Sequence, residues 1–98
     1  MKAVFITYNQ ALTEAVNSIL DRHQIRGYTK WADVQGRGTN TGEPHLGNHT
    51  WPAMNSAILA IIEEERIEPL LASLKKLNDK AEEQGLRAFV WNMDEQQV

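Results

Sequence analysis

Apolar and polar positions recur along the chain in patterns that predict two helices. In two places, apolar residues repeat at i, i+3, i+4 and i+7, as on one face of an amphipathic helix. The first repeat follows Asn9, a residue type that favours helix N-caps. The second lies in a helix predicted over residues 65–84, with Pro69 in the first turn and Gly85 as a terminator. The two stripes are Leu12, Ala15, Val16, Ile19, Leu20 and then Ile67, Leu70, Leu71, Leu74, Leu77, Ala81.

Four short segments rich in β-branched and aromatic residues predict strands over residues 2–8, 28–35, 57–62 and 86–91. The order of elements is therefore β-α-β-β-α-β, and its short links favour a split β-α-β sheet. The predicted fold class is α+β, a ferredoxin-like sandwich. It has an antiparallel four-stranded sheet with two helices on one face, in a single domain over residues 1–98.

Residues 36–56, between the second and third predicted strands, have neither a helical nor a strand period. Hairpin loops usually have about two to five residues, and loops beyond about 12–15 are commonly functional or disordered. The segment contains Leu46, Trp51 and Met54 and only two charged residues, Arg37 and Glu43. This composition does not resemble that of disordered segments, so we expect the loop to pack on its own domain or on another chain.

Composition excludes several classes of function. The formal charge is −3 and the sequence has no cysteine, which argues against a nucleic-acid partner and excludes disulfides and thiolate sites. No apolar run approaches the roughly 18 residues of a membrane span, and the N-terminal segment does not resemble a signal peptide. We therefore expect a cytoplasmic protein with no direct membrane insertion.

The sequence offers little support for catalysis. Its three serines, Ser18, Ser56 and Ser73, lack the surroundings of a nucleophile. The acidic run at residues 63–65 precedes a predicted helix, where negative charge interacts favourably with the helix dipole. We therefore expect a non-enzymatic protein. A small enzyme of the dimeric α+β barrel type, with a histidine at a cleft, remains a weaker alternative.

The motif Gly27-x-Thr29-x-x-x-Val34-x-Gly36-x-Gly38 leads from the second strand into the long segment. This pattern and the order of elements resemble the P-II nitrogen-regulatory signalling proteins over nearly the whole chain. Segment 36–56 takes the place of the T-loop of that family. The remainder of the segment is more similar to that of small divergent PII-like members.

The resemblance implies a homotrimer whose sheets pack inward and which binds adenine nucleotides (ADP, ATP or AMP) in clefts between subunits. It also implies that the loop contacts a regulated protein, for which a membrane transporter is a candidate. The aromatic residues point the same way, because two helices could not cover all four of Phe5, Trp31, Phe89 and Trp91. The candidate ligand-binding residues, from the family motif, are Thr29, Gly36, Arg37, Gly38, Thr39 and Asn40.

The phosphate-binding positions depart from the family pattern. Thr39 and Thr41 stand where the family has Arg and Lys, and the acidic link 82–85 replaces a glycine-rich phosphate loop. Residues 93–95 replace basic residues of the family. Each lost charge-assisted hydrogen bond is worth about 1.5–3 kcal/mol, so we expect weakened phosphate binding.

Histidines in the long segment allow a second function. His45 and His49 could bind a divalent metal with Glu43 or Asp33 as a third ligand, and zinc or copper(II) would suit these donors. The alternative function is therefore a metal-binding, heavy-metal-response PII-like protein. Against this, the two histidines could simply hold the loop by hydrogen bonds. His23, at the end of the first helix, is expected to interact with the helix dipole.

Overall fold

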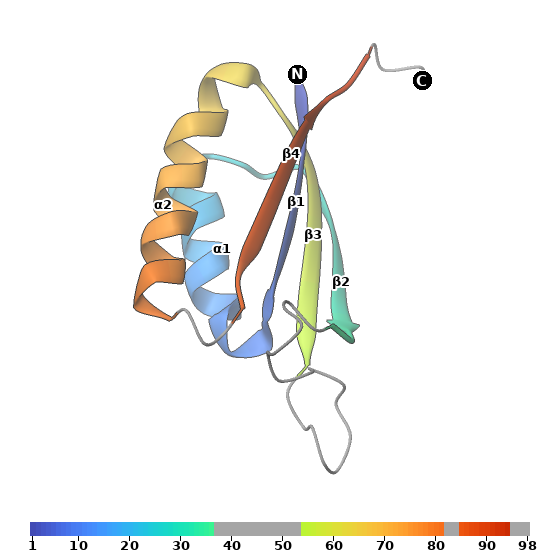
Figure 1. The fold of residues 1–98 in the computed structure, drawn as a ribbon. Helices are drawn as coiled ribbons and strands as arrows, with labels where there is room; N and C mark the ends of the chain where they lie inside the picture. Colours follow the sequence, from blue (N-terminus) through green and yellow to red (C-terminus); the bar gives the residue numbers. More distant parts are fainter. Residues whose placement is uncertain (37–53, 82–84, 95–98) are drawn as a thin grey trace.

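The structure is a computed structural model that describes residues 1–36, 54–81 and 85–94. Both helices lie on the same side of one sheet, which confirms the predicted ferredoxin-like α+β fold (Figure 1). Among the described residues, neither helix is both long and apolar enough to cross a membrane. The elements are β1 (Lys2–Asn9), η1 (Gln10–Leu12), α1 (Thr13–Arg22), β2 (Tyr28–Val34), β3 (Asn55–Ile62), η2 (Glu64–Arg66), α2 (Ile67–Lys80) and β4 (Arg87–Asn92).

The four strands form an antiparallel sheet in the order β2-β3-β1-β4. In the middle of the sheet, Val4 of β1 pairs with Ala60 of β3 and with Val90 of β4. The pairing of β2 with β3 shifts register between Trp31 and Val34, close to the end of β2. The sheet therefore has regular central strands and an irregular edge where segment 37–53 leaves it.

One face of the sheet packs against the helices and forms the core. Val4 and Ile6 of β1 and Ile58 of β3 have no exposed surface, and they cluster with Leu20 of α1 and Leu70 of α2. Leu20 and Leu70 belong to the two predicted helical stripes, so the helical period places this part of the core correctly. In the strands, alternate residues face the core.

Each α-helix begins with a short 3-10 turn. The predicted cap is confirmed, since Asn9 Oδ1 accepts a hydrogen bond from the backbone N–H of Ala11 at 2.9 Å, although it caps η1 rather than α1 directly. The second helix ends at Lys80, four residues before the predicted end. Its apolar stripe ends at Ala81, so no further apolar face is available to pack. Gly85, predicted as the terminator, instead adopts a left-handed φ of 72° in the link to β4.

The boundaries of all four strands differ from the prediction by one or two residues. β3 begins at Asn55 because Ser56 is buried opposite Tyr8 and donates its hydroxyl to the Ala32 carbonyl at 2.6 Å. β4 runs to Asn92, one residue further than predicted.

His23 lies at the C-terminal end of α1, as predicted. Its Nε2 also forms a hydrogen bond of 2.8 Å with the Ser73 hydroxyl of α2, which joins the two helices.

Candidate functional site

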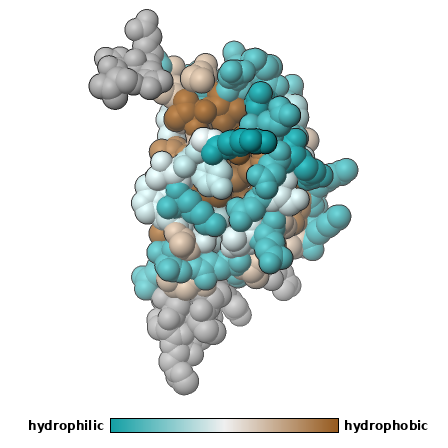
Figure 2. Space-filling model, turned by 180° about the vertical axis from the view of Figure 1, so that it is seen from behind, coloured by the Kyte–Doolittle hydropathy of each residue, from teal (hydrophilic) through white to brown (hydrophobic). Residues whose placement is uncertain are grey.

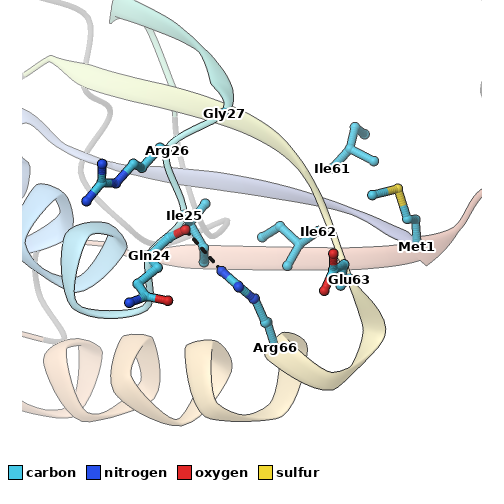
Figure 3. A pocket seen from close by; sticks show the side chains of 9 residues that line it. All are labelled: Met1, Gln24, Ile25, Arg26, Gly27, Ile61, Ile62, Glu63 and Arg66. Carbon is cyan, nitrogen blue, oxygen red and sulfur yellow. Dashed lines mark hydrogen bonds between the residues drawn. The ribbon is translucent and has the colours of Figure 1, made fainter.

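A pocket of about 200 Å³ opens at the end of the sheet where β2 begins and β3 ends. Its walls come from the α1–β2 link, the end of β3, η2 and the N-terminus (Figure 3). This volume is below the roughly 300–1,000 Å³ of sites that enclose a drug-sized ligand. The lining residues are Met1, Gln24, Ile25, Arg26, Gly27, Ile61, Ile62, Glu63 and Arg66.

Gly27 leaves space at one wall of this pocket. A Cβ built on Gly27 would have no atom within 4 Å, so nothing in the described structure fills the space beside its backbone. A ligand can therefore approach the main chain closely at this position. On the opposite wall, Ile62 is buried in the core whereas Ile61 is 42% exposed. The pocket thus lies beside an uncovered part of the sheet.

The pocket is polar at one side. Two arginines, Arg26 and Arg66, and one carboxylate, Glu63, contribute to its lining. Next to them, the pKa of the Glu65 carboxyl is lowered from its ordinary value. The largest cause is a hydrogen bond with the backbone of Glu65 itself, and a hydrogen bond with the Glu63 side chain and the positive charge of Arg66 lower the pKa further. Glu65 is thus ionised over a wider pH range than a free glutamate.

The sheet face opposite the helices exposes large apolar side chains. Strand alternation places Trp31, Ile61, Phe89 and Trp91 on this face, and each is between 42% and 54% exposed. We call these four residues the bare face. From behind, the molecule shows hydrophobic surface among hydrophilic groups in its upper part (Figure 2). Contiguous exposed apolar surface of this kind is typical of an interaction site.

The structure separates the two described residues of the predicted ligand site. Thr29 lies near the beginning of β2, and Gly36 follows its end. Seven residues at about 3.3 Å per residue correspond to about 23 Å, which is longer than a nucleoside diphosphate. In an extended chain Thr29 and Gly36 therefore lie toward opposite ends of β2 rather than side by side.

Gly36 lies against the first residue of β3. A Cβ on Gly36 would come within 2.6 Å of Asn55 Nδ2, so a larger side chain would displace Asn55. The atom displaced is the far end of a flexible side chain, so a small side chain at position 36 would move the Asn55 amide and leave the backbone in place.

The base of the long segment is held by Gln10 of η1. Its backbone N–H donates to the Met54 carbonyl at 2.9 Å, and its Nε2 donates to the Ala32 carbonyl at 2.7 Å and to Asp33 Oδ1. Because Met54 and Ala32–Asp33 lie on either side of the segment, one residue joins both strand ends. We call these contacts the Gln10 clamp.

The other predicted site residues lie outside the described residues. They are the ligand candidates Arg37, Gly38, Thr39 and Asn40 and the metal candidates Glu43, His45 and His49. Within residues 1–36, 54–81 and 85–94, no three histidine or acidic side chains gather as a metal site would need.

Sequence reasoning missed several pocket residues. Arg66 directly follows the acidic run 63–65, and Arg26 directly precedes the Gly27 motif. Each could therefore have been noted in the sequence as a basic residue beside a distinctive segment. What no local pattern indicated is that Ile61 and Arg66 belong to the same pocket as Gly27.

The sequence model of the family described as "Nitrogen regulatory protein P-II" matches residues 1–98. The chain belongs to the P-II family. This confirms the resemblance that the Gly27–Gly38 motif indicated. P-II proteins are regulatory signalling proteins, and they are typically trimeric. Comparison with curated proteins gave no significant match.

Solved structures of PII-like proteins have the same fold. CPII from Thiomonas intermedia K12, bound to ADP and bicarbonate, is 26% identical with a TM-score of 0.72, covering 92% of this chain and 82% of that chain. A further CPII structure, bound to ADP, AMP and bicarbonate, is 24% identical with a TM-score of 0.74 and the same coverage. A PII-like signalling protein from Thermus thermophilus is 22% identical with a TM-score of 0.67, covering 94% of this chain and 85% of that chain.

Proposed function

We propose that this chain is a trimeric, non-enzymatic regulatory protein of the cytoplasm. It binds an adenine nucleotide between its subunits and acts on a partner protein through segment 36–56. The observation that carries the proposal is the continuity of the pocket with the bare face. Ile61 belongs to both, so a subunit packed on the bare face would also close the pocket.

Assembly through the bare face has a clear driving force. Fully burying a large apolar side chain is worth about 1.5–3 kcal/mol, so covering the exposed halves of Trp31, Phe89 and Trp91 would contribute about 1 kcal/mol each. A trimer repeats this contribution at every interface. The P-II family is typically trimeric, which supports this state over other oligomers.

An adenine nucleotide is the ligand class best supported. CPII, at 26% identity, was crystallised with ADP and bicarbonate. In this chain the open backbone of Gly27 and the exposed apolar side chain of Ile61 suit a flat base, and Thr29 is two residues from Gly27. Thr29 of one subunit and Gly36 to Asn40 of a neighbour would then contact a single nucleotide, in agreement with their separation along β2.

Two measurements test the proposal together. Size-exclusion chromatography with light scattering should give three times the chain mass of 11.1 kDa. Isothermal titration should give heat with ADP, AMP or ATP. A folded monomer, or the absence of heat at millimolar nucleotide, would contradict the proposal.

Partner action through the loop is tested separately. Deleting residues 39–48 should leave the thermal transition and the trimer unchanged, because the Gln10 clamp holds both strand ends without them. Capture of a partner protein, or of a membrane transporter, should be lost. Loss of folding in this variant would show that the segment has a structural role instead.

The alternative function, metal binding through Glu43, His45 and His49, has no observation in the described part of the chain that favours it. Titration with zinc and copper(II) decides between the two. Heat that disappears in a His45→Ala/His49→Ala variant would support the metal site.

A further inference from the structure

Arg66 reaches across the pocket to the C-terminal end of α1. Its Nη1 donates to the Gln24 carbonyl at 3.0 Å (Figure 3). The same Nη1 donates to the His23 carbonyl at 3.3 Å. The last carbonyls of a helix lack partners within the helix and carry its partial negative charge. The positive charge of Arg66 therefore compensates the partial negative charge at the end of α1. The same contacts hold the Arg66 side chain at the pocket wall.

The backbone at this point is unusual. Gln24 has a φ of 57°, a left-handed conformation that costs a residue other than glycine roughly 1–2 kcal/mol. The Ile25 and Gln24 N–H groups bond to the carbonyls of Leu20 and Asp21, which closes α1 in the Schellman pattern. The left-handed residue belongs to this helix ending, and the hydrogen bond from Arg66 to its carbonyl holds it there.

The guanidinium of Arg66 retains donors for a ligand. Both of its hydrogen bonds use Nη1, so Nε and Nη2 have no partner among residues 1–36, 54–81 and 85–94. In the same described part, the salt bridges join Lys2 to Glu64 and Lys75 to Asp79, and neither involves Arg66. No carboxylate of these residues lies within salt-bridge distance to neutralise its charge. A cation fixed in one orientation by two carbonyls binds an anion without first losing side-chain entropy.

We propose that Arg66 determines the specificity of the pocket by binding the phosphate of a nucleotide through Nε and Nη2. The pocket would then select a nucleoside phosphate over the nucleoside. This inference rests on the proposed nucleotide function. It also accounts for the replacement of basic residues by Thr39, Thr41 and the acidic link 82–85, because the positive charge comes from a different element.

Arg22 provides a matched control. It lies in the last turn of α1, is exposed, and does not line the pocket. Removing Arg22 changes the net charge by the same amount as removing Arg66 and leaves the proposed phosphate contact in place.

The experiment is isothermal titration of adenosine, AMP and ADP into the full-length wild type, Arg66→Gln, Arg66→Lys and Arg22→Gln. The wild type should bind AMP about 10- to 100-fold more tightly than adenosine, as for a charge-assisted hydrogen bond. Arg66→Gln should lose this preference and keep its affinity for adenosine. Arg66→Lys should retain part of the preference, and Arg22→Gln all of it.

Each other outcome has a distinct meaning. If the wild type binds no nucleotide, the proposed function fails. If Arg66→Gln keeps the wild-type ratio of AMP to adenosine affinity, or weakens both ligands equally, Arg66 does not contact phosphate, and the nucleotide function stands without it. If Arg66→Gln alone does not fold, wild type and variant are compared in a Gln24→Gly background, which relieves the left-handed strain and keeps the test decisive.

Discussion

The two faces of the sheet are built from the same strands and serve different purposes. On the helix side, Val4, Ile6 and Ile58 are fully buried. On the other side, Phe89 and Trp91 are about half exposed, although they are larger. Since neighbouring residues of a strand point to opposite faces, a single alternating sequence encodes both surfaces. One face stabilises the monomer, and the proposed trimer would bury the other against a second copy of the chain.

The largest effect is expected from a charge on the helix side. Leu74→Asp places an unpaired carboxylate in a position that is 3% exposed, so it should cost about 3–5 kcal/mol and abolish the cooperative thermal transition measured by circular dichroism. The control is Ala72→Asp, an exposed position of the same helix, which should cost less than about 1 kcal/mol. Equal melting curves for Leu74→Asp and wild type would show that this face is not the core.

A charge on the bare face should act on assembly instead. Phe89→Asp removes apolar surface that the monomer already exposes, so the chain should stay folded and elute as a monomer of 11.1 kDa in light scattering. Asn92→Asp, an exposed change on the same strand, should leave the trimer intact. If Phe89→Asp remains trimeric, assembly does not use the bare face.

A substitution at Gly27 should weaken ligand binding without affecting folding. Gly27→Val meets no atom at its Cβ and needs no left-handed backbone, so the melting temperature should stay within a few degrees of wild type. The added methyl groups should occupy the pocket and raise the Kd for ADP at least about tenfold. An unchanged Kd would place the nucleotide elsewhere.

The smallest effect is expected at the Gln10 clamp. Gln10→Ala removes two side-chain hydrogen bonds of about 0.5–1.5 kcal/mol each. Hydrogen exchange should accelerate at the ends of β2 and β3 while the central strands keep their protection. Uniform acceleration across the sheet would mean that Gln10 supports global stability rather than the base of the segment.

Local patterns predicted the fold well and the site only in part. In β1 alternate residues are buried, and in α2 the buried residues form one stripe, because burial repeats with the period of each element. These periods identify the residues that pack together in the core. Residues 82–84 are Glu, Glu and Gln, which have high helix propensity. The helix nevertheless ends at Lys80, next to the last residue of its apolar stripe. Propensity alone does not show where packing stops.

The contacts that shape the pocket depend on distant residues. Arg66 and Gln24 are 42 positions apart, and Gln10 and Ala32 are 22 apart. Such pairs follow from the sheet order and have no local sequence signal. The separation of Thr29 and Gly36, by contrast, follows from the sequence, because the strand predicted over residues 28–35 begins just before Thr29 and ends just before Gly36.

Titration of ADP into the wild-type trimer and into the folded Phe89→Asp monomer tests the central claim most directly. Phe89 is absent from the pocket lining, so its effect on binding must act through assembly. We expect about one ADP per chain in the trimer and at least a hundredfold weaker binding by the monomer. Equal Kd values for the two proteins would contradict a nucleotide site completed by a neighbouring subunit.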